Sequence, residues 1–190
     1  FHLILLAKNY NGYKNLMKIV STGHIEGKYY DKPRVCHEII EKYSQDLVCC
    51  SACIAGEIPR AIIAGDMKGA EEAIMWHKKV FGEDFYLEVQ QHKTEIPGMS
   101  QEVYERQLIA NEGIFELAAK TGQKGCILPC SSALEAMEFK GTEVYGVDTL
   151  EDVLRILGGE DCSDLLIQNR YSRMLAEGGK DGISFQAEEM

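Results

Sequence analysis

The sequence predicts an α/β chain built from two pieces, and three observations carry this prediction. Short apolar runs alternate with amphipathic helical patterns along most of the 190 residues. The composition, with 45% hydrophobic and 26% charged residues, is typical of a globular protein with a buried core. The charge changes along the chain: residues 1–121 hold 14 Lys and Arg against 17 Asp and Glu, whereas residues 122–190 hold 6 against 13. This step near Gly122 indicates two origins joined in one chain.

The first piece shows the pattern of strands followed by helices. Tyr13, Leu16, Met17 and Val20 recur at helical spacing and predict the apolar stripe of its first helix. Apolar runs predict buried strands over 1–7, 47–51 and 85–89. Helical spacing predicts helices over 13–20, 37–43, 57–64, 68–81 and 101–120. The last helix has a capping residue before it, Ser100, and after it Gly122, which suits a left-handed backbone position.

The second piece repeats the rhythm on a smaller scale. Residues 125–128 and 143–147 are predicted strands, each followed by a predicted helix, over 133–139 and 149–157. Thr149 and Asp152 stand three residues apart, which is typical of a helix start. Residues 160–190 are polar and acidic with little periodicity, so we expect an acidic linker or tail there.

Composition excludes several classes of protein. No stretch approaches the ~20 apolar residues that cross a bilayer, and no secretory leader pattern is present. Seven cysteines in a chain of this length favour reduced thiols and a cytoplasmic location. The net charge of −10 predicts no direct binding of nucleic acid. Because the chain opens with Phe1 rather than Met, and its first strand has no preceding turn, we expect two interior fragments joined.

Residues 1–121 resemble the polymerase-and-histidinol-phosphatase (PHP) domain of bacterial replicative DNA polymerase III alpha subunits. The segments that carry the resemblance follow the family's order and spacing: HLILLAKNYNGYKNLMKIVS, IEGKYYDKPR, LVCCSACIAGEIPR, AGDMKGAEEA, FGEDFYLEVQQH and IFELAAKTG. The resemblance implies a distorted (β/α) barrel, here truncated, over residues 1–122. It also implies that the chain is, by origin, part of a DNA-directed DNA polymerase with other replisome subunits as partners.

The resemblance places two metal ligands in this chain, Cys53 in the motif SAC and His92 after YLEVQ. A thiolate and an imidazole suit zinc, and manganese is the other candidate. The family's first ligands lie in a His-x-His motif that this chain lacks. Its last ligands lie in an Asn-Asp-x-His motif, where this chain reads KGCILPCSSA. Since metal-dependent hydrolysis needs most of its ligands, we expect at most weak metal binding, no catalytic residue and no phosphoesterase activity.

Residues 124–160 resemble a different family, the magnesium-chelatase-like AAA ATPases related to the competence protein ComM. The resemblance lies in the run KGCILPCSSALEAMEFKGTEVYGVDTLEDVLRIL. It implies a βαβα fragment over residues 123–159 that comes from a region outside the ATPase module. The chain has no G-x-x-x-x-G-K-[ST] motif, so we expect neither ATPase activity nor another cofactor.

Other patterns leave alternatives open. Cys50-x-x-Cys53 with Cys126 and Cys130 suggests a four-cysteine zinc site, although buried strand cysteines explain the same pattern better. Glu88 is either a general base near His92 or the polar face of an edge strand. Trp76 is expected in the core rather than in a platform for stacking bases.

The sequence therefore predicts a partial PHP domain joined to a ComM-like fragment and lacking a complete catalytic site. One alternative is a minimal metal-dependent phosphoesterase that uses Cys53, His92 and borrowed carboxylates. The other is a non-catalytic interaction module of the replication or recombination machinery, suggested by the acidic second piece. We also expect the strand 125–128 to replace a lost barrel strand by pairing in parallel with 85–89 or 1–7.

Overall fold

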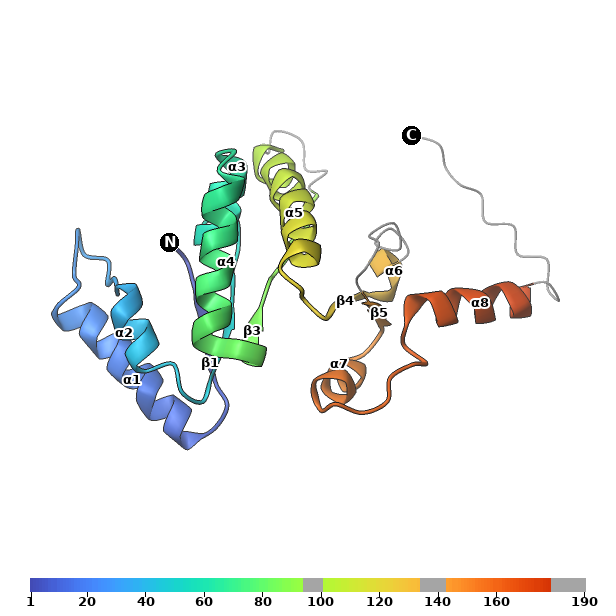
Figure 1. Ribbon diagram of the computed structural model, residues 1–190, viewed down its shortest axis with the longest axis horizontal. Helices are drawn as coiled ribbons and strands as arrows, with labels where there is room; N and C mark the ends of the chain where they lie inside the picture. The colour runs from blue at the N-terminus through green and yellow to red at the C-terminus, as the bar shows by residue number, and fades with distance from the viewer. Residues whose placement is uncertain (94–100, 134–142, 179–190) are drawn as a thin grey trace. The chain divides into compact units, whose positions relative to one another are not determined.

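The computed structural model describes residues 1–93, 101–133 and 143–178, and it divides into two compact units (Figure 1). The first unit is Phe1–Thr121 and the second is Gly122–Met190. Each unit is described by itself below. The predicted capping role of Ser100 and most of the helix predicted over 133–139 lie outside the described residues.

Unit 1 contains a small mixed sheet with the strand order β1-β2-β3. Strand β1 (Ile4–Ala7) is antiparallel to β2 (Leu47–Cys50), and β3 (Phe85–Tyr86) lies parallel to β2 on its other side. The described residues therefore form a three-stranded sheet, and no closed barrel is present among them. Strand β1 lies at an edge, and Ile4 and Leu6 are exposed where a buried strand was expected.

Strand β3 is shorter than the predicted run 85–89, because its partner ends early. The backbone turns out of β2 at Ala52, whose φ is +61°. Beyond that point the Glu88 amide donates to the Ser51 hydroxyl (2.8 Å) instead of to a strand carbonyl. A side-chain hydrogen bond thus replaces the next step of the ladder.

In the described part of unit 1, five α-helices accompany this sheet, and most begin and end where the sequence predicts. Helix α1 begins one turn early because the Asn9 side chain accepts from the amides of Asn11 and Gly12. Helix α5 ends before Gly122, whose φ of +70° confirms the predicted left-handed position. The helices are α1 (Tyr10–Ile25), α2 (His37–Lys42), α3 (Glu57–Ile63), α4 (Met67–Phe81) and α5 (Glu102–Lys120), with a 3-10 turn, η1, at Gly82–Asp84.

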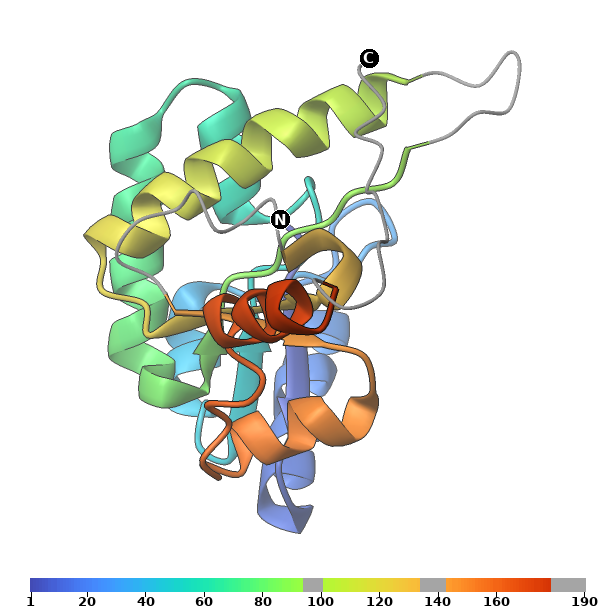
Figure 2. The same cartoon turned by 90° about the vertical axis from the view of Figure 1, so that its right-hand side faces the viewer.

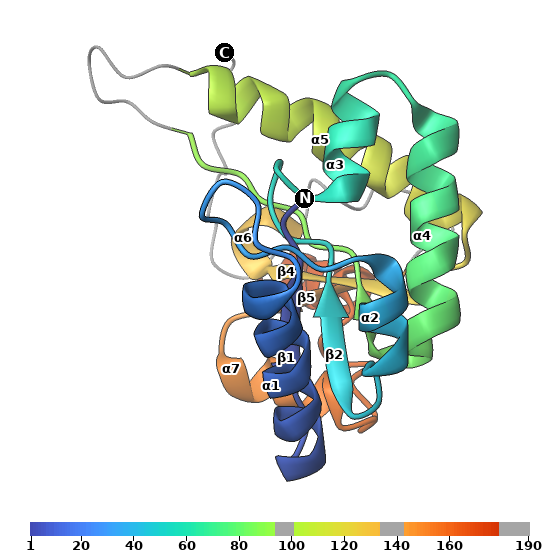
Figure 3. The ribbon, with the colours of Figure 1, turned by 90° about the vertical axis from the view of Figure 1, so that its left-hand side faces the viewer.

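Helix α1 lies across β1, as Figure 3 shows, but the face that it buries differs from the prediction. Gly12, Ile19 and Gly23 are its buried residues. Of the predicted apolar stripe only Leu16 packs against the core, and the other three side chains are exposed: Tyr13, Met17 and Val20. Glycine is required at Gly12, because an added Cβ there would lie 2.1 Å from the Asp46 carbonyl oxygen.

The core of unit 1 also includes a histidine. His77 of α4 is 2% exposed and stacks on Phe85, with 5.1 Å between the ring centroids. Its Nδ1 lies 2.8 Å from the Ala73 carbonyl oxygen. His77 is therefore part of the core, and Trp76 packs against the core as expected.

The described part of unit 2 is a two-stranded parallel sheet with three helices. Strand β4 (Gly125–Pro129) pairs with β5 (Glu143–Val147) over their full length. The prediction that β4 pairs with a strand of the first sheet is therefore wrong, because β4 and β5 form a separate two-stranded sheet. Helices α7 and α8 both contact β5 (Figure 2). The helices are α6 (Cys130–Ala133), α7 (Leu150–Leu157) and α8 (Ile167–Gly178).

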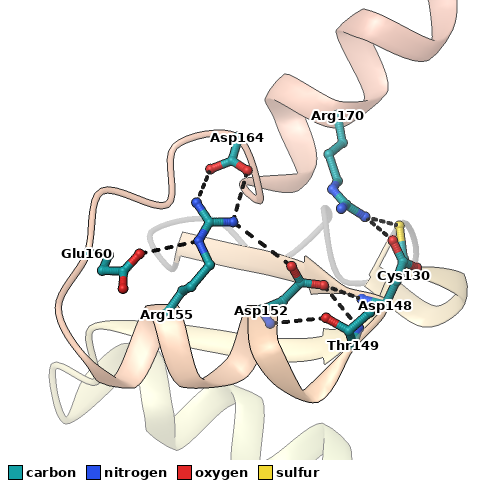
Figure 4. Close-up of polar contacts among 8 residues, drawn as sticks. All are labelled: Cys130, Asp148, Thr149, Asp152, Arg155, Glu160, Asp164 and Arg170. Atoms are coloured by element: carbon teal, nitrogen blue, oxygen red, sulfur yellow. Dashed lines mark hydrogen bonds and ion pairs between the residues drawn. The ribbon is translucent and has the colours of Figure 1, made fainter.

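Residues 160–178 belong to unit 2 rather than to a linker, which corrects the prediction for this part of the tail. Leu165 and Ile167 are buried, and Ile167 packs with Val144 of β5. The Arg155 guanidinium donates to both oxygens of the Asp164 carboxylate (3.3 and 3.2 Å) and so holds the connecting segment against α7 (Figure 4). The sequence of this segment has little helical or strand periodicity, so periodicity did not predict these apolar and ionic contacts.

A second arginine in unit 2 attaches α8. Arg170 donates to the Asp148 carboxylate (2.7 Å) and contacts the Cys130 sulfur (3.1 Å), so it joins three segments (Figure 4). At the start of α7, Thr149 and Asp152 form the predicted capping box, in which each side chain accepts from the other residue's amide.

Candidate functional site

A pocket lies in unit 1 where the chain leaves the parallel strands β2 and β3 and meets helix α5. The carboxyl ends of parallel strands are the usual position of ligand sites in α/β proteins. The pocket is lined by the loops after both strands, by one face of α5 and by Pro59 of α3. The lining residues are Ala52, Cys53, Ile54, Pro59, Glu88, Gln90, Gln107, Ala110, Asn111 and Ile114.

The loop 51–56 after β2 shapes one wall of the pocket. Ser51 is buried, and its hydroxyl accepts from the Glu88 amide, which ties this loop to the segment after β3. The Gly56 amide donates to the Cys53 carbonyl (2.7 Å) and closes a tight turn. An added Cβ at Gly56 would lie 2.2 Å from the Ser51 carbonyl oxygen, so the turn requires glycine.

Cys53 is the first residue of this turn and contacts the amino-terminal end of the chain. Its sulfur lies 3.4 Å from Nδ1 of His2. The backbone of His2 is held in place because its amide donates to the Ala55 carbonyl (3.0 Å). The pair therefore places one thiol and one imidazole beside the pocket.

His92 is held by Gln107, a residue of α5 that is only 3% exposed. The Gln107 Oε1 accepts from the His92 amide (2.8 Å), and its Nε2 lies 2.9 Å from His92 Nδ1. With Oε1 used as the acceptor, Nε2 must donate to Nδ1, and the proton of the neutral ring then lies on the His92 Nε2. Neither ring nitrogen therefore presents a free lone pair in this arrangement.

The remaining polar groups of the pocket are mostly amides. The Gln90 side chain donates to the Glu88 carboxylate (2.7 Å). The Asn111 side chain donates to the Gln90 carbonyl (2.9 Å). Glu88 thus lines the pocket with its carboxylate oriented by a neighbouring amide, and it does not continue β3.

The structure brings one of the two predicted site residues into the lining of this pocket, and the other lies outside it. Cys53 lines the pocket, whereas His92 is exposed and contacts the lining residue Gln107. Sequence reasoning missed His2 and Gln107. His2 comes close only through the fold, 51 positions from its partner in the sequence. Gln107 stands in a helical pattern where a polar residue ordinarily faces solvent, so its burial gave no signal.

The described donors do not fit a multi-metal centre. Among residues 1–93, 101–133 and 143–178, no group of three His, Cys, Asp or Glu side chains is placed to hold an ion. The pocket has one thiol and one carboxylate, and its other polar lining groups are amides. Amides are weak ligands for zinc, which prefers thiolate, imidazole and carboxylate. The donor set of this pocket therefore supports no reaction step that passes through a metal.

The cysteine pattern is explained by burial. Cys49 is fully buried in β2, and burial raises the pKa of its thiol to about 12. Burial raises the pKa of the Cys50 thiol as well, and that of Cys126 to about 11. Zinc binds the thiolate form, so these positions disfavour a four-cysteine zinc site.

Comparison with known proteins agrees with the arrangement of unit 1. Residues 1–92 match the family model of the PHP domain. The chain is 56% identical over 92 residues to the DNA polymerase III subunit alpha of Borreliella burgdorferi, covering 48% of this chain and 8% of that protein. The subunit of Aquifex aeolicus is 40% identical over 119 residues, covering 63% of this chain and 9% of the relative. The subunit of Chlamydia trachomatis is 34% identical over 132 residues, covering 64% of this chain and 10% of the relative.

Residues 1–92 are thus a PHP domain, with its candidate site at the ends of β2 and β3. More particularly, they are homologous to the PHP region of DNA polymerase III alpha subunits. The chain spans less than about a tenth of the length of the first of these relatives. In the parts of the chain that the structure describes, no helix combines the length and apolar character needed to cross a membrane.

Proposed function

We propose that this chain is a partial PHP domain of the replicative polymerase type joined to a ComM-like segment, and that it has no complete hydrolytic centre. The observation that carries this proposal is the amide-rich pocket lining. Of the two expected ligands only Cys53 lines the pocket, and three of its other polar lining residues are the amides Gln90, Gln107 and Asn111. A phosphoesterase of this kind needs several ions held by strong donors to activate water and to stabilise the leaving group.

The proposal assigns domains and context as follows. Residues 1–122 are the partial PHP domain, residues 123–159 the ComM-like fragment, and residues 160–190 the acidic end of the chain. The similarity to polymerase alpha subunits supports a role beside other replisome subunits and a cytoplasmic location. The metal binding that we propose is weak binding of zinc or manganese at Cys53 and His92, and it requires the His92 ring to leave its hydrogen bond with Gln107.

Elemental analysis combined with an activity assay tests this proposal. We expect the purified chain, dialysed against zinc or manganese, to retain less than about one ion per molecule, because too few donors converge. We expect no hydrolysis of an aryl phosphate above the rate without protein. Retention of about two or more ions with measurable turnover would refute the inactive-remnant assignment.

One observation favours the minimal phosphoesterase as the second candidate. Glu88 lines the same pocket as Cys53 and supplies the carboxylate that such a site would borrow. In that case Cys53→Ala and Glu88→Gln would each abolish the hydrolysis and lower the metal content. The matched control is His24→Ala, since His24 is exposed on α1, outside the residues that line this pocket.

The interaction module remains the third candidate, with the acidic second unit as its motivation. Immobilised chain should then retain a replisome or helicase subunit from a bacterial extract, and a unit 2 charge variant should lose that subunit. The variant Glu160→Lys/Asp161→Lys changes two exposed carboxylates and leaves the buried Leu165 in place. Equal retention by the variant and by the original chain would count against an electrostatic role of unit 2.

A further inference from the structure

The positive charge of this acidic chain is concentrated in its first 34 residues. They hold six Lys and Arg against two Asp and Glu, a net charge of +4, whereas residues 35–190 sum to −14. Helix α1 carries no acidic side chain at all. The first 34 residues are therefore locally cationic within a chain of net charge −10, although Lys8 is paired with the Asp84 carboxylate (2.8 Å).

The lysines of α1 lie next to aromatic rings and not next to carboxylates. The Lys14 ammonium is 4.5 Å from the centroid of the Tyr10 ring, and Lys18 is 5.1 Å from that of Tyr43. Among the described residues, neither lysine has a carboxylate within salt-bridge distance. Tyr10 is 69% exposed and stacks with the exposed Tyr13, at an interplanar angle of 25°. Cations and aromatic faces are thus presented together to solvent.

The segment after α1 exposes a further aromatic ring, that of Tyr30, whose backbone conformation is strained. Tyr29 and Lys32 exchange two backbone hydrogen bonds (3.0 and 3.1 Å) around a two-residue turn. The turn residues Tyr30 and Asp31 have φ values of +46° and +58°, a conformation that ordinarily selects glycine or asparagine. Tyr30 is nevertheless the residue at the tip, and it is 84% exposed. Strain of this kind is retained mainly where function requires the side chain.

The flanks of this turn are also cationic. Lys28 and Lys32 stand on either side of the tip, and the Arg34 guanidinium lies 4.8 Å from the centroid of the Tyr29 ring. Lys28 contacts the exposed Asp31 carboxylate, which is the single acidic group of the turn. We refer to residues 27–34 as the tyrosine hairpin.

Helix α1 and the tyrosine hairpin form one connected surface. The amides of Glu26 and Gly27 both donate to the Thr22 carbonyl, so the hairpin starts directly from the last turn of α1. An added Cβ at Gly23 would lie 3.2 Å from the Val35 side chain, so the returning chain packs closely on the helix. Figure 1 shows the hairpin extending from the end of α1 away from the sheet.

We propose that α1 and the tyrosine hairpin bind single-stranded nucleic acid. Lysine and arginine side chains neutralise phosphates, and exposed tyrosine rings stack on unpaired bases. This proposal replaces the expectation, drawn from the net charge, that the chain has no nucleic-acid contact. An acidic peptide would use the cations alone and would leave Tyr10, Tyr13 and Tyr30 without a binding role. The proposal is independent of the metal content of the pocket.

Fluorescence anisotropy with the full chain and a labelled oligothymidylate of about 20 nucleotides tests the proposal. We expect binding at about 20 mM salt that weakens steeply as salt is added. The variant Lys14→Glu/Lys18→Glu should weaken binding about tenfold or more and reduce the salt slope by about 1.4, since each lost single-strand phosphate contact contributes about 0.7. The control Lys68→Glu/Lys79→Glu makes the same change of net charge on α4 and should stay within about twofold.

The variant Tyr30→Gly separates binding from folding. Glycine relieves the positive φ, so the variant should unfold at an equal or higher urea concentration. It should nevertheless bind the oligonucleotide about fivefold more weakly, because a stacking ring is lost. Absence of binding by the original chain at low salt would refute the proposal, as would equal losses in the α1 and α4 variants. If polyglutamate competes as well as the oligonucleotide and Tyr30→Gly has no effect, the surface recognises acidic protein and not nucleic acid.

Discussion

Gln107 binds His92 through both ends of its side-chain amide: it accepts from the backbone amide at 2.8 Å and donates to the ring Nδ1 at 2.9 Å. The buried glutamine thereby fixes both the position and the tautomer of an exposed histidine. A residue expected to serve as a ligand is thus held by an amide of α5.

Replacing Gln107 with leucine should test this relationship. Gln107→Leu removes both hydrogen bonds and puts an apolar side chain of similar size in the place of the amide. We therefore expect the free energy of unfolding to fall by about 1 kcal/mol in urea titrations. Nitrogen NMR of the His92 ring should show the Nε2-protonated tautomer in the original chain and a mixture in the variant. Gln91→Leu, at an exposed neighbour, is the control and should change neither quantity.

Ala52 should tolerate glycine better than any larger residue. Its φ of +61° is unfavourable for alanine by about 1–2 kcal/mol, which exceeds the entropy that glycine loses on folding, about 0.5–1 kcal/mol. Ala52→Gly should therefore be neutral or stabilising by up to about 1 kcal/mol in urea. Ala61→Gly, within α3, should instead destabilise by about 1 kcal/mol. Equal losses at both positions would show that Ala52 is not strained.

His77 should make the stability of unit 1 depend on pH. Burial lowers the pKa of its imidazole below 6.5, with Glu57 acting in the opposite direction and His37 in the same direction. The unfolded chain therefore takes up a proton before the folded chain does, and stability present above pH 6.5 is lost as the pH falls below it. Urea midpoints measured between about pH 7.5 and 5 should fall.

The control for this prediction is a pair of leucine variants. His77→Leu replaces the titratable ring beside Phe85 with an apolar side chain and should flatten the dependence of the urea midpoint on pH. His24→Leu, at an exposed position of α1, should leave the dependence unchanged. A slope that persists in His77→Leu would assign the effect to another group, with the exposed pair of His37 and Glu57 (3.1 Å) as the first candidate.

The seven cysteines should react in an order set by burial. Cys36 is exposed and should be modified first by a disulfide reagent. Cys49 is fully buried with a pKa of about 12, so it should react only when the chain unfolds. Mass spectrometry of peptides after timed labelling gives the order, and labelling in urea should modify every cysteine. Early modification of Cys49 would mean that β2 opens readily.

Unit 2 should depend on its capping box. Thr149→Ala removes the oxygen that accepts from the Asp152 amide (3.2 Å) and should lower the stability of this unit by about 1 kcal/mol. Circular dichroism on heating would measure the change. Ser172→Ala, whose hydroxyl instead donates to the Gln168 carbonyl on an exposed helix face, should have a smaller effect.

Local signals in the sequence predicted most elements of the fold, and long-range contacts account for what it missed. The Thr149 capping box and the left-handed Gly122 follow from short motifs and are confirmed. The buried face of α1 was predicted wrongly, because periodicity marks apolar residues and cannot show that Gly12 packs directly on the Asp46 backbone. The same limit applied to β4, whose pattern identifies a strand but not its partner.

The candidate site divides in the same way. Cys53 was predicted as a metal ligand; it lines the pocket, and its role as a ligand stays a prediction. His2 and Gln107 were not predicted, because His2 meets Cys53 only through the fold and Gln107 is a polar residue buried on a helix. The resemblance to polymerase PHP domains, now supported over residues 1–92, supplied candidate ligands that periodicity alone does not identify.

The turn that ends in Gly56 has an evolutionary consequence. Its shape is imposed by backbone crowding, since any side chain at that position would collide with the Ser51 carbonyl oxygen. Selection for a stable scaffold would therefore preserve the hollow at the strand ends even after selection for chemistry had ceased. A chain with this turn would therefore keep the outline of its pocket whether or not the pocket carried out a reaction.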